Sequence, residues 1–162
     1  MKRGEKGVLL LIALIVIGAG ARNLWHVETE HDVDKGIPYF STATPALARE
    51  AMDIYRKENC KGCHSLWTVK DMLESVPAPI LDGIGSLRTE EWFYQYFSAA
   101  NPQAILPSRL KQEFHMPSYA QLPEHDRHVL ASYMASLKVK DWYLEDTRKA
   151  EYEKLTGKDY HP

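Results

Sequence analysis

Cys60-Lys61-Gly62-Cys63-His64 is the stretch of sequence that decides the fold, and it lies near the middle of a 162-residue chain. The chain has 2 cysteines, and both belong to this stretch. Two thiols with an adjacent imidazole are able to ligate a metal, to exchange electrons as a dithiol, or to hold a prosthetic group. The surrounding sequence discriminates among these kinds of site.

Three alternatives to a prosthetic group are disfavoured. A zinc site needs further Cys or His ligands at matching spacing, and the chain has no second Cys-x-x-Cys. A thioredoxin-like dithiol follows a strand in a βαβ chain, and no such alternation precedes Cys60. A plain disulfide would not need His64. The motif therefore predicts one covalently attached haem c, with thioether bonds from Cys60 and Cys63 and a proximal imidazole from His64.

An amphipathic helix is predicted directly before the motif, over residues 46–59. Thr44 followed by Pro45 is typical of an N-cap with proline at the first helical position. Apolar side chains recur at helical spacing on one face of this segment, at Leu47, Ala51, Ile54 and Tyr55. We therefore expect the motif at the carboxyl end of a helix.

Met116 is the predicted second axial ligand of the iron. A His/Met iron needs a thioether from the side opposite His64. Met116 follows His64 by 52 residues, which is enough chain to surround the macrocycle. Pro117 keeps this methionine out of a helix.

The other candidates for this position are weaker. Met1 belongs to the amino-terminal segment, and Met52 and Met134 lie in helical patterns, where methionine usually fills the core. Met72 follows the motif too closely to reach the opposite side of the ring. His115 is the rival ligand, because bis-imidazole coordination would give a lower potential than His/Met coordination. We favour a solvated loop position for it.

The amino terminus carries an export signal. An uncharged apolar run, Val8–Ala21, follows a basic cluster that contains Lys2, Arg3 and Lys6. Ala19-Gly20-Ala21 matches a cleavage site, and cleavage would release a soluble periplasmic protein. Extended through Trp25, the segment is able to span a bilayer, so we predict residues 1–25 as a retained transmembrane helix. Both alternatives place residues 26–162 outside the cytoplasm.

The remainder divides into a linker over residues 26–43, a haem domain over 44–138 and an extension over 139–162. The extension is predicted to be helical and to cover the domain or dock on a partner, the alternative being a solvated tail. A helix is also predicted over residues 123–138, with an apolar face made of Leu130, Tyr133, Met134 and Leu137. No strand alternation of useful length is present, so the predicted class is all-α.

The amino-acid composition excludes several classes of protein. Hydrophobic residues make up 44% of the chain and charged residues 26%, which excludes a fibrous or wholly disordered protein. The net charge is −2 and no basic stripe is visible. Since nucleic-acid binding requires charge that neutralises phosphate, we expect no nucleic-acid partner.

The order of these features resembles that of class I c-type cytochromes over residues 44–138. The shared features are a helix, the CKGCH motif, a proline-containing loop, a middle helix, a Met-Pro loop and a last helix with the sequence LASYMASL. The resemblance implies the class I cytochrome c fold. In that fold the first and last helices cross, and a residue at the position of Tyr133 packs at the crossing.

The resemblance also implies further haem contacts. Residues 78–81, Ala-Pro-Ile-Leu, are similar to the family's Gly-Pro-x-Leu loop, with Ala78 where glycine is usual. The proline carbonyl of that loop accepts a hydrogen bond from the proximal imidazole, which would make Pro79 the partner of His64. Arg88 and Trp92 match positions that donate to haem propionates, the alternatives being a surface arginine and a core tryptophan.

The function that the resemblance implies is transfer of single electrons by an iron with both axial positions filled, without an enzymatic site of its own. An anchor joined to one haem domain also resembles the small cytochrome subunit of nitric oxide reductase. We therefore expect a redox partner protein, with stable assembly in a respiratory membrane complex as an alternative. The second alternative is a five-coordinate haem that binds a small ligand.

Overall fold

The computed structural model describes residues 7, 11–22, 35–67, 76 and 78–161. It divides into two compact units, Met1–Gly36 and Ile37–Pro162. In the first unit residues 11–22 are helical. Among the described residues no helix has both the length and the hydropathy needed to cross a membrane. The rest of the predicted anchor, residues 1–6, 8–10 and 23–25, lies outside the described residues.

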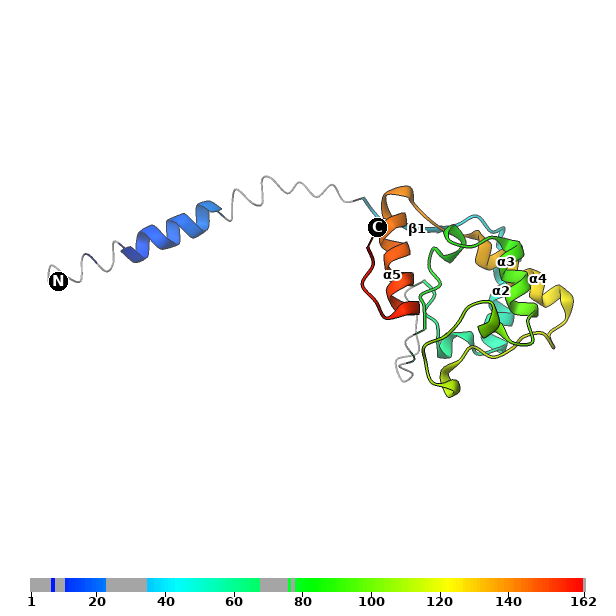
Figure 1. Ribbon diagram of the computed structural model, residues 1–162. Coiled ribbons are helices and arrows are strands. Elements are labelled where there is room, and N and C mark those ends of the chain that lie inside the picture. The colour runs from blue at the N-terminus through cyan, green and yellow to red at the C-terminus, as the bar shows by residue number, and fades with distance from the viewer. Residues whose placement is uncertain (1–6, 8–10, 23–34, 68–75, 77, 162) are drawn as a thin grey trace. The chain divides into compact units, whose positions relative to one another are not determined.

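The second unit is built mainly from helices joined by long loops (Figure 1). Its α-helices are α2 (Pro45–Lys57), α3 (Glu90–Ser98), α4 (Glu124–Ser136) and α5 (Leu144–Thr156). Single 3₁₀ turns separate them, at η1 (Cys60–Gly62), η2 (Ile84–Ser86), η3 (Pro102–Ala104), η4 (Gln112–Phe114) and η5 (Asp141–Tyr143). This helix-rich domain fits the predicted all-α class.

A short antiparallel ribbon was not predicted. Strand β1 (Tyr39–Ser41) pairs with β2 (Leu137–Val139), with Phe40 opposite Lys138. The predicted helix end at Lys138 is therefore wrong by two residues, because Ser136 ends α4 and the next residues pair with β1. Strands of three residues are too short to produce a recognisable alternation of apolar and polar side chains.

Helix α2 has the predicted start and buried face. The Thr44 hydroxyl accepts a hydrogen bond from the Leu47 amide at 3.2 Å, and Pro45 is the first helical residue. Ala51, Ile54 and Tyr55 are buried, while Leu47 is only partly buried. After the helix ends, Asn59 adopts a left-handed conformation with φ of 54° and turns the chain into the Cys-x-x-Cys-His motif.

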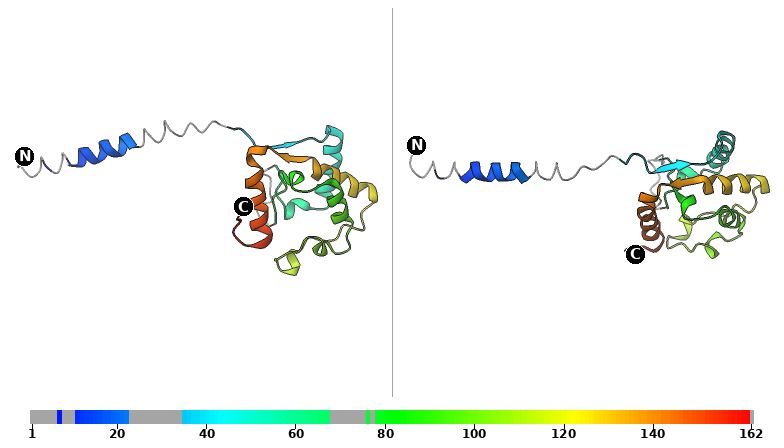
Figure 2. Two further views of the ribbon diagram at one scale, coloured as in Figure 1. Left: turned by 45° about the horizontal axis from the view of Figure 1, so that its top comes forward. Right: turned by 90° about the horizontal axis from the view of Figure 1, so that it is seen from above.

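Helix α4 packs against both α2 and α3 and forms the centre of the core (Figure 2). All four residues of the apolar face predicted over residues 123–138 are buried, Leu130, Tyr133 and Met134 in α4 and Leu137 in β2. The Tyr133 hydroxyl also accepts a hydrogen bond from the Trp67 indole at 3.2 Å. Helices α2, α3 and α4 thus pack together as one wall of the domain.

Gly85 in turn η2 lies directly against the carboxyl end of α4. A Cβ atom at this position would overlap the backbone carbonyl oxygens of Met134 and Ala135. The Gly85 carbonyl accepts a hydrogen bond from the Lys138 ammonium at 2.6 Å. Only glycine allows the turn to approach the helix this closely.

We expect Gly85→Ala to destabilise the domain by about 2 kcal/mol, since neither backbone segment is able to move without breaking other contacts. The loss corresponds to a fall in Tm of about 4–8 °C, which thermal unfolding followed by circular dichroism would measure. Ala104→Ser, which adds one heavy atom at an exposed position, is the control. An unchanged Tm in Gly85→Ala would contradict this account of the turn.

The carboxyl-terminal extension folds onto its own domain. Helix α5 lies on the far side of the long loops from α2, α3 and α4 (Figures 1 and 2). The Arg109 side chain donates a hydrogen bond from Nε to the Lys154 carbonyl at 2.9 Å. It also fills the space that a Cβ atom at Gly157 would meet, and Gly157 ends the helix with a left-handed φ of 68°. The extension is therefore a helix packed on its domain and not a solvated tail, while docking on a partner stays a prediction.

Candidate haem site

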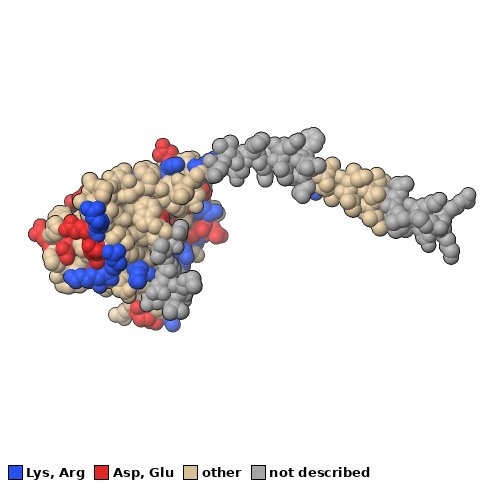
Figure 3. Space-filling view, turned by 180° about the vertical axis from the view of Figure 1, so that it is seen from behind, with Lys and Arg blue, Asp and Glu red and all other residues tan. Residues whose placement is uncertain are grey.

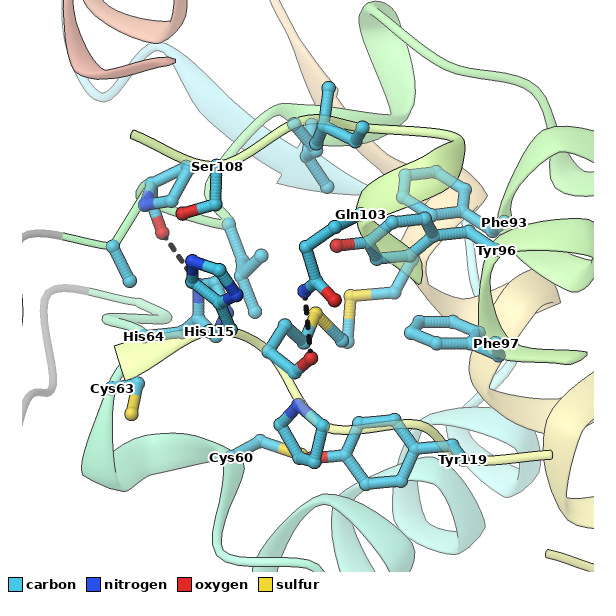
Figure 4. A pocket seen from close by; sticks show the side chains of 18 of the residues that line it. Cys60, Cys63, His64, Phe93, Tyr96, Phe97, Gln103, Ser108, His115 and Tyr119 are labelled. Atoms are coloured by element: carbon cyan, nitrogen blue, oxygen red, sulfur yellow. Dashed lines mark hydrogen bonds between the residues drawn. The ribbon is translucent and has the colours of Figure 1, made fainter. Parts of the chain in front are cut away.

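A mainly apolar cavity of about 330 Å³ lies between the helices and the long loops. The Cys-x-x-Cys-His motif borders it on one side, and aromatic side chains of α3 border it on the opposite side (Figure 4). These aromatic residues are Phe93, Tyr96 and Phe97, together with Trp92. All seven residues proposed from the sequence line the cavity: Cys60, Cys63, His64, Pro79, Arg88, Trp92 and Met116.

His64 is held by hydrogen bonds on both its ring and its backbone. The ring Nδ1 lies 2.8 Å from the Pro79 carbonyl, so it carries the proton and donates it (Figure 4). The His64 carbonyl accepts a hydrogen bond from the Tyr55 hydroxyl at 3.0 Å. A neutral imidazole protonated at Nδ1 has its lone pair on Nε2, the nitrogen that coordinates a metal in this tautomer. The alanine at position 78 is thus compatible with the Pro79 contact.

The two cysteines are thiols, without a disulfide bond. Burial raises the pKa of the Cys60 thiol to about 11, and a hydrogen bond with Tyr119 opposes that effect only in part. Redox-active dithiols need a lowered thiol pKa, because the thiolate is the nucleophile. The environment of Cys60 therefore disfavours a thioredoxin-like function.

Met116 enters the cavity from a loop that two hydrogen bonds fix. The Gln103 amide donates to the Met116 carbonyl at 2.9 Å (Figure 4), and the Ser118 hydroxyl donates to the Ala99 carbonyl at 2.8 Å. Met134 lines the same cavity from helix α4, where it also belongs to the core. Met52 packs against the core, and Met72 lies outside the described residues.

His115 also lines the cavity, but its ring is engaged with the protein backbone. Its Nε2 lies 2.9 Å from the Leu110 carbonyl, so that nitrogen carries a proton and donates it. The contact also makes the ring half-buried, whereas we expected a solvated histidine. This hydrogen bond occupies one of the two ring nitrogens that would be available to a metal.

Arg88 and Trp92 pack against one another at the edge of the cavity. The Arg88 guanidinium lies over the Trp92 ring, 5.1 Å from its centroid, and Trp92 stacks on Tyr96 with ring centroids 5.0 Å apart. Arg88 also forms an ion pair with Glu151 of α5, at 3.0 Å. Both proposed residues are therefore brought to the site, although Arg88 already has a carboxylate partner.

A family model described as Cytochrome c matches residues 48–138. The chain belongs to the cytochrome c family. No curated protein and no solved structure was matched. The predicted resemblance to c-type cytochromes is confirmed, and with it the covalently attached haem c and the role of a haem-based electron carrier.

The cavity of this cytochrome c domain suits the haem that the family carries. Paired thiols at its border, an oriented imidazole and an apolar lining are the groups that covalent attachment and axial ligation require. Among the described residues, no three His, Cys, Asp or Glu side chains gather into an alternative metal site. Cys60 and Cys63 would hold the group covalently, and His64 would coordinate its iron, which supplies a one-electron couple.

Several residues of the cytochrome c cavity were not predicted. Gln103 and Tyr119 have no local pattern that reveals their contacts with Met116 and Cys60. Glu151 does have one, because it lies on the same helical face as Leu144 and Leu155. An acidic residue within an apolar stripe is a pattern that sequence analysis is able to detect.

Proposed function

We propose that the protein is a monohaem cytochrome c with His64 and Met116 as axial ligands, which carries single electrons on the extracytoplasmic side of a membrane. Its amino-terminal segment would hold it at that membrane, and a redox enzyme or a second carrier would exchange electrons with it. Electron transfer by the family domain is the established part of this function. The ligands, the compartment and the partner are the proposed part.

The observation that carries the proposal is the presence of both an oriented imidazole and a fixed loop methionine at one cavity. His64 is oriented by Pro79, and the carbonyl of Met116 is held by Gln103. His115 is the rival for the second axial position, and its Nε2 already donates to a backbone carbonyl. A site with both axial ligands supplied by the protein favours electron transfer over ligand binding, because a small ligand needs an open position.

The sequence supports a position outside the cytoplasm at a membrane surface. A basic cluster followed by the apolar run Val8–Ala21 is typical of an exported or anchored segment. If the segment is retained, a linker of residues 26–43 would keep the haem domain at a high effective concentration near a membrane enzyme. The likeness to the small subunit of nitric oxide reductase motivates the expectation of such a partner.

Electrons would cross the border of the cavity near the thioether bonds. Cys60 and Cys63 are partly exposed there, and Lys61 between them is exposed. On one face of the domain, Lys and Arg side chains lie interspersed with Asp and Glu (Figure 3). Transient electron-transfer complexes typically use small contact surfaces, so the border near Cys60, Lys61 and Cys63 would suffice for a partner.

Two measurements on the protein from solubilised membranes test the proposal. We expect the ferric protein to show the weak far-red absorption of iron–sulfur charge transfer, and a reversible one-electron titration with a positive midpoint potential, since a thioether favours ferrous iron. A clearly negative midpoint, or absence of the far-red band, would contradict Met116 as ligand.

Recovery of the protein only from the soluble fraction would contradict the anchor, and co-purification would identify the partner.

A further inference from the structure

Helix α5 supplies part of the cavity wall, although it lies beyond residues 48–138, which the cytochrome c model matches. Three of its residues line the cavity: Glu151, Lys154 and Leu155. Glu151 is the unexpected member of this set, because a carboxylate there faces an apolar cavity. Only 14% of its side chain is exposed. Such a carboxylate needs a partner or a proton.

The partner of Glu151 is Arg88, which lies in the loop between η2 and α3. Its guanidinium lies 3.0 Å from the Glu151 carboxylate, and only 23% of the Arg88 side chain is exposed. The same guanidinium lies over the Trp92 ring and donates a hydrogen bond to the Leu87 carbonyl at 3.0 Å. Arg88 is thus held in place from three directions, and the carboxylate is held with it.

Burial and the ion pair act on the Glu151 carboxyl in opposite directions. Burial is the larger effect, so its pKa is raised above the ordinary glutamate value in spite of the attraction to Arg88. The other ionisable side chains that line the cavity come from several elements: Tyr55, Glu58, Cys60, Cys63, His64, Tyr96, Arg109, His115, Tyr119 and Lys154. Among the described groups, only Arg88 contributes an electrostatic effect to that pKa.

We propose that Glu151 is a redox-linked proton acceptor, which takes up one proton from water when the haem domain takes up one electron. The inference rests on the proposed function, because it requires a reversible one-electron couple at the cavity. The electron comes from a redox partner, or from a chemical titrant in the experiment. The proton binds one carboxylate oxygen, so the charge added on reduction is neutralised within the domain.

The direction of the coupling follows from electrostatics. Reduction makes the cavity more negative by one charge, which raises the proton affinity of a nearby carboxylate. The midpoint potential must then fall as the pH rises between the Glu151 pKa values of the oxidised and reduced forms. At a pH above both of these pKa values the carboxylate is ionised in both redox forms, and its negative charge opposes reduction. At a pH below both values it is protonated in both forms and has no charge.

The experiment is a redox titration of the haem-loaded full chain at a series of pH values, for the wild type, Glu151→Gln and Asp146→Asn. Glutamine keeps the shape of the side chain but does not ionise. Asp146 is an exposed acid on the same helix and is the matched control. Proton uptake during reduction, followed with an indicator dye in weak buffer, is the second measurement.

We expect the wild-type potential to fall with rising pH, with a slope that approaches a tenfold change in the reduction equilibrium per pH unit, about 59 mV for one electron. Glu151→Gln should lose this slope and the proton uptake. Its potential should match the wild type at the acid end and exceed it at higher pH. Asp146→Asn should follow the wild type.

Two results would overturn the assignment. A pH-independent wild-type potential would show that no proton accompanies the electron. A slope that persists in Glu151→Gln would place the acceptor elsewhere, on a haem propionate or on another side chain. Failure of the proposed function is distinct from both, because the wild type would then lack covalent haem or a reversible couple altogether.

Discussion

Replacing Cys60 and Cys63 together by serine is expected to abolish covalent haem attachment. Serine has no thiol, so neither thioether bond to the porphyrin is able to form, and the group would be held only by axial ligation and apolar contacts. After denaturing electrophoresis we expect haem staining of the band to be lost completely. The measurement needs a host that is competent in cytochrome maturation.

Lys61→Ala is the matched control for the double serine variant. Lys61 lies within the same motif, but its side chain is exposed and takes no part in the covalent chemistry. We expect this control to retain full haem staining. A double variant that keeps its pigment under denaturing conditions would mean that the haem is attached through other residues, and the interpretation of the motif would be wrong.

Met116→Ala is expected to have the second-largest effect. Alanine leaves one axial position of the iron without a protein ligand, so the far-red iron–sulfur absorption should disappear. The midpoint potential should fall by an amount on the order of 0.1 V, within the roughly 0.8 V that axial ligation spans. Absorption spectroscopy and a redox titration of the purified variant measure the two effects.

Two control variants separate ligation by Met116 from the alternatives. Met134→Leu removes the other described thioether at the cavity, and His115→Ala removes the rival imidazole. Both should keep the far-red band. If Met116→Ala keeps that band while another methionine variant loses it, the ligand has been assigned to the wrong loop. A wild type that binds carbon monoxide as readily as Met116→Ala would instead support the five-coordinate alternative.

The position of α5 changes how the carboxyl-terminal extension is understood. The sequence predicts an extension that covers the domain or docks on a partner, and deletion of residues 139–162 would be a direct test of docking. The structure places Glu151, Lys154 and Leu155 at the cavity and Leu137–Val139 in a strand. Such a deletion would therefore remove part of the haem site, and point substitutions at exposed aromatic residues of the extension, such as Trp142→Ala in η5, are the better test of docking.

Local features of this cytochrome were predictable because they depend on neighbouring residues. The Thr44 cap and the buried face of α2 follow from helical geometry, in which each contact joins residues three or four positions apart. The Cys-x-x-Cys-His motif is similarly local, since covalent attachment to one edge of a porphyrin fixes the spacing of its residues. The apolar face of α4 followed from the same periodicity.

Contacts between distant segments were less predictable. Strand β2 follows α4 only because β1, nearly a hundred residues earlier, pairs with it. The contact between Gln103 and the Met116 carbonyl depends on two loops that share no sequence pattern. The hydrogen bond between Pro79 and His64 was predicted from the family resemblance, and not from the spacing of residues in this sequence.

By itself, the sequence determined the covalent chemistry, the helix-rich class and the family, since these depend on residue types at short, fixed spacings. Only the tertiary structure decided which side chains share the cavity and which of them are already engaged. The pair of Arg88 and Glu151 shows the physical reason most clearly. The sequence marks Glu151 as an acid within an apolar stripe, but it does not pair this residue with Arg88, 63 positions earlier; only packing brings the two together and removes most of both side chains from water.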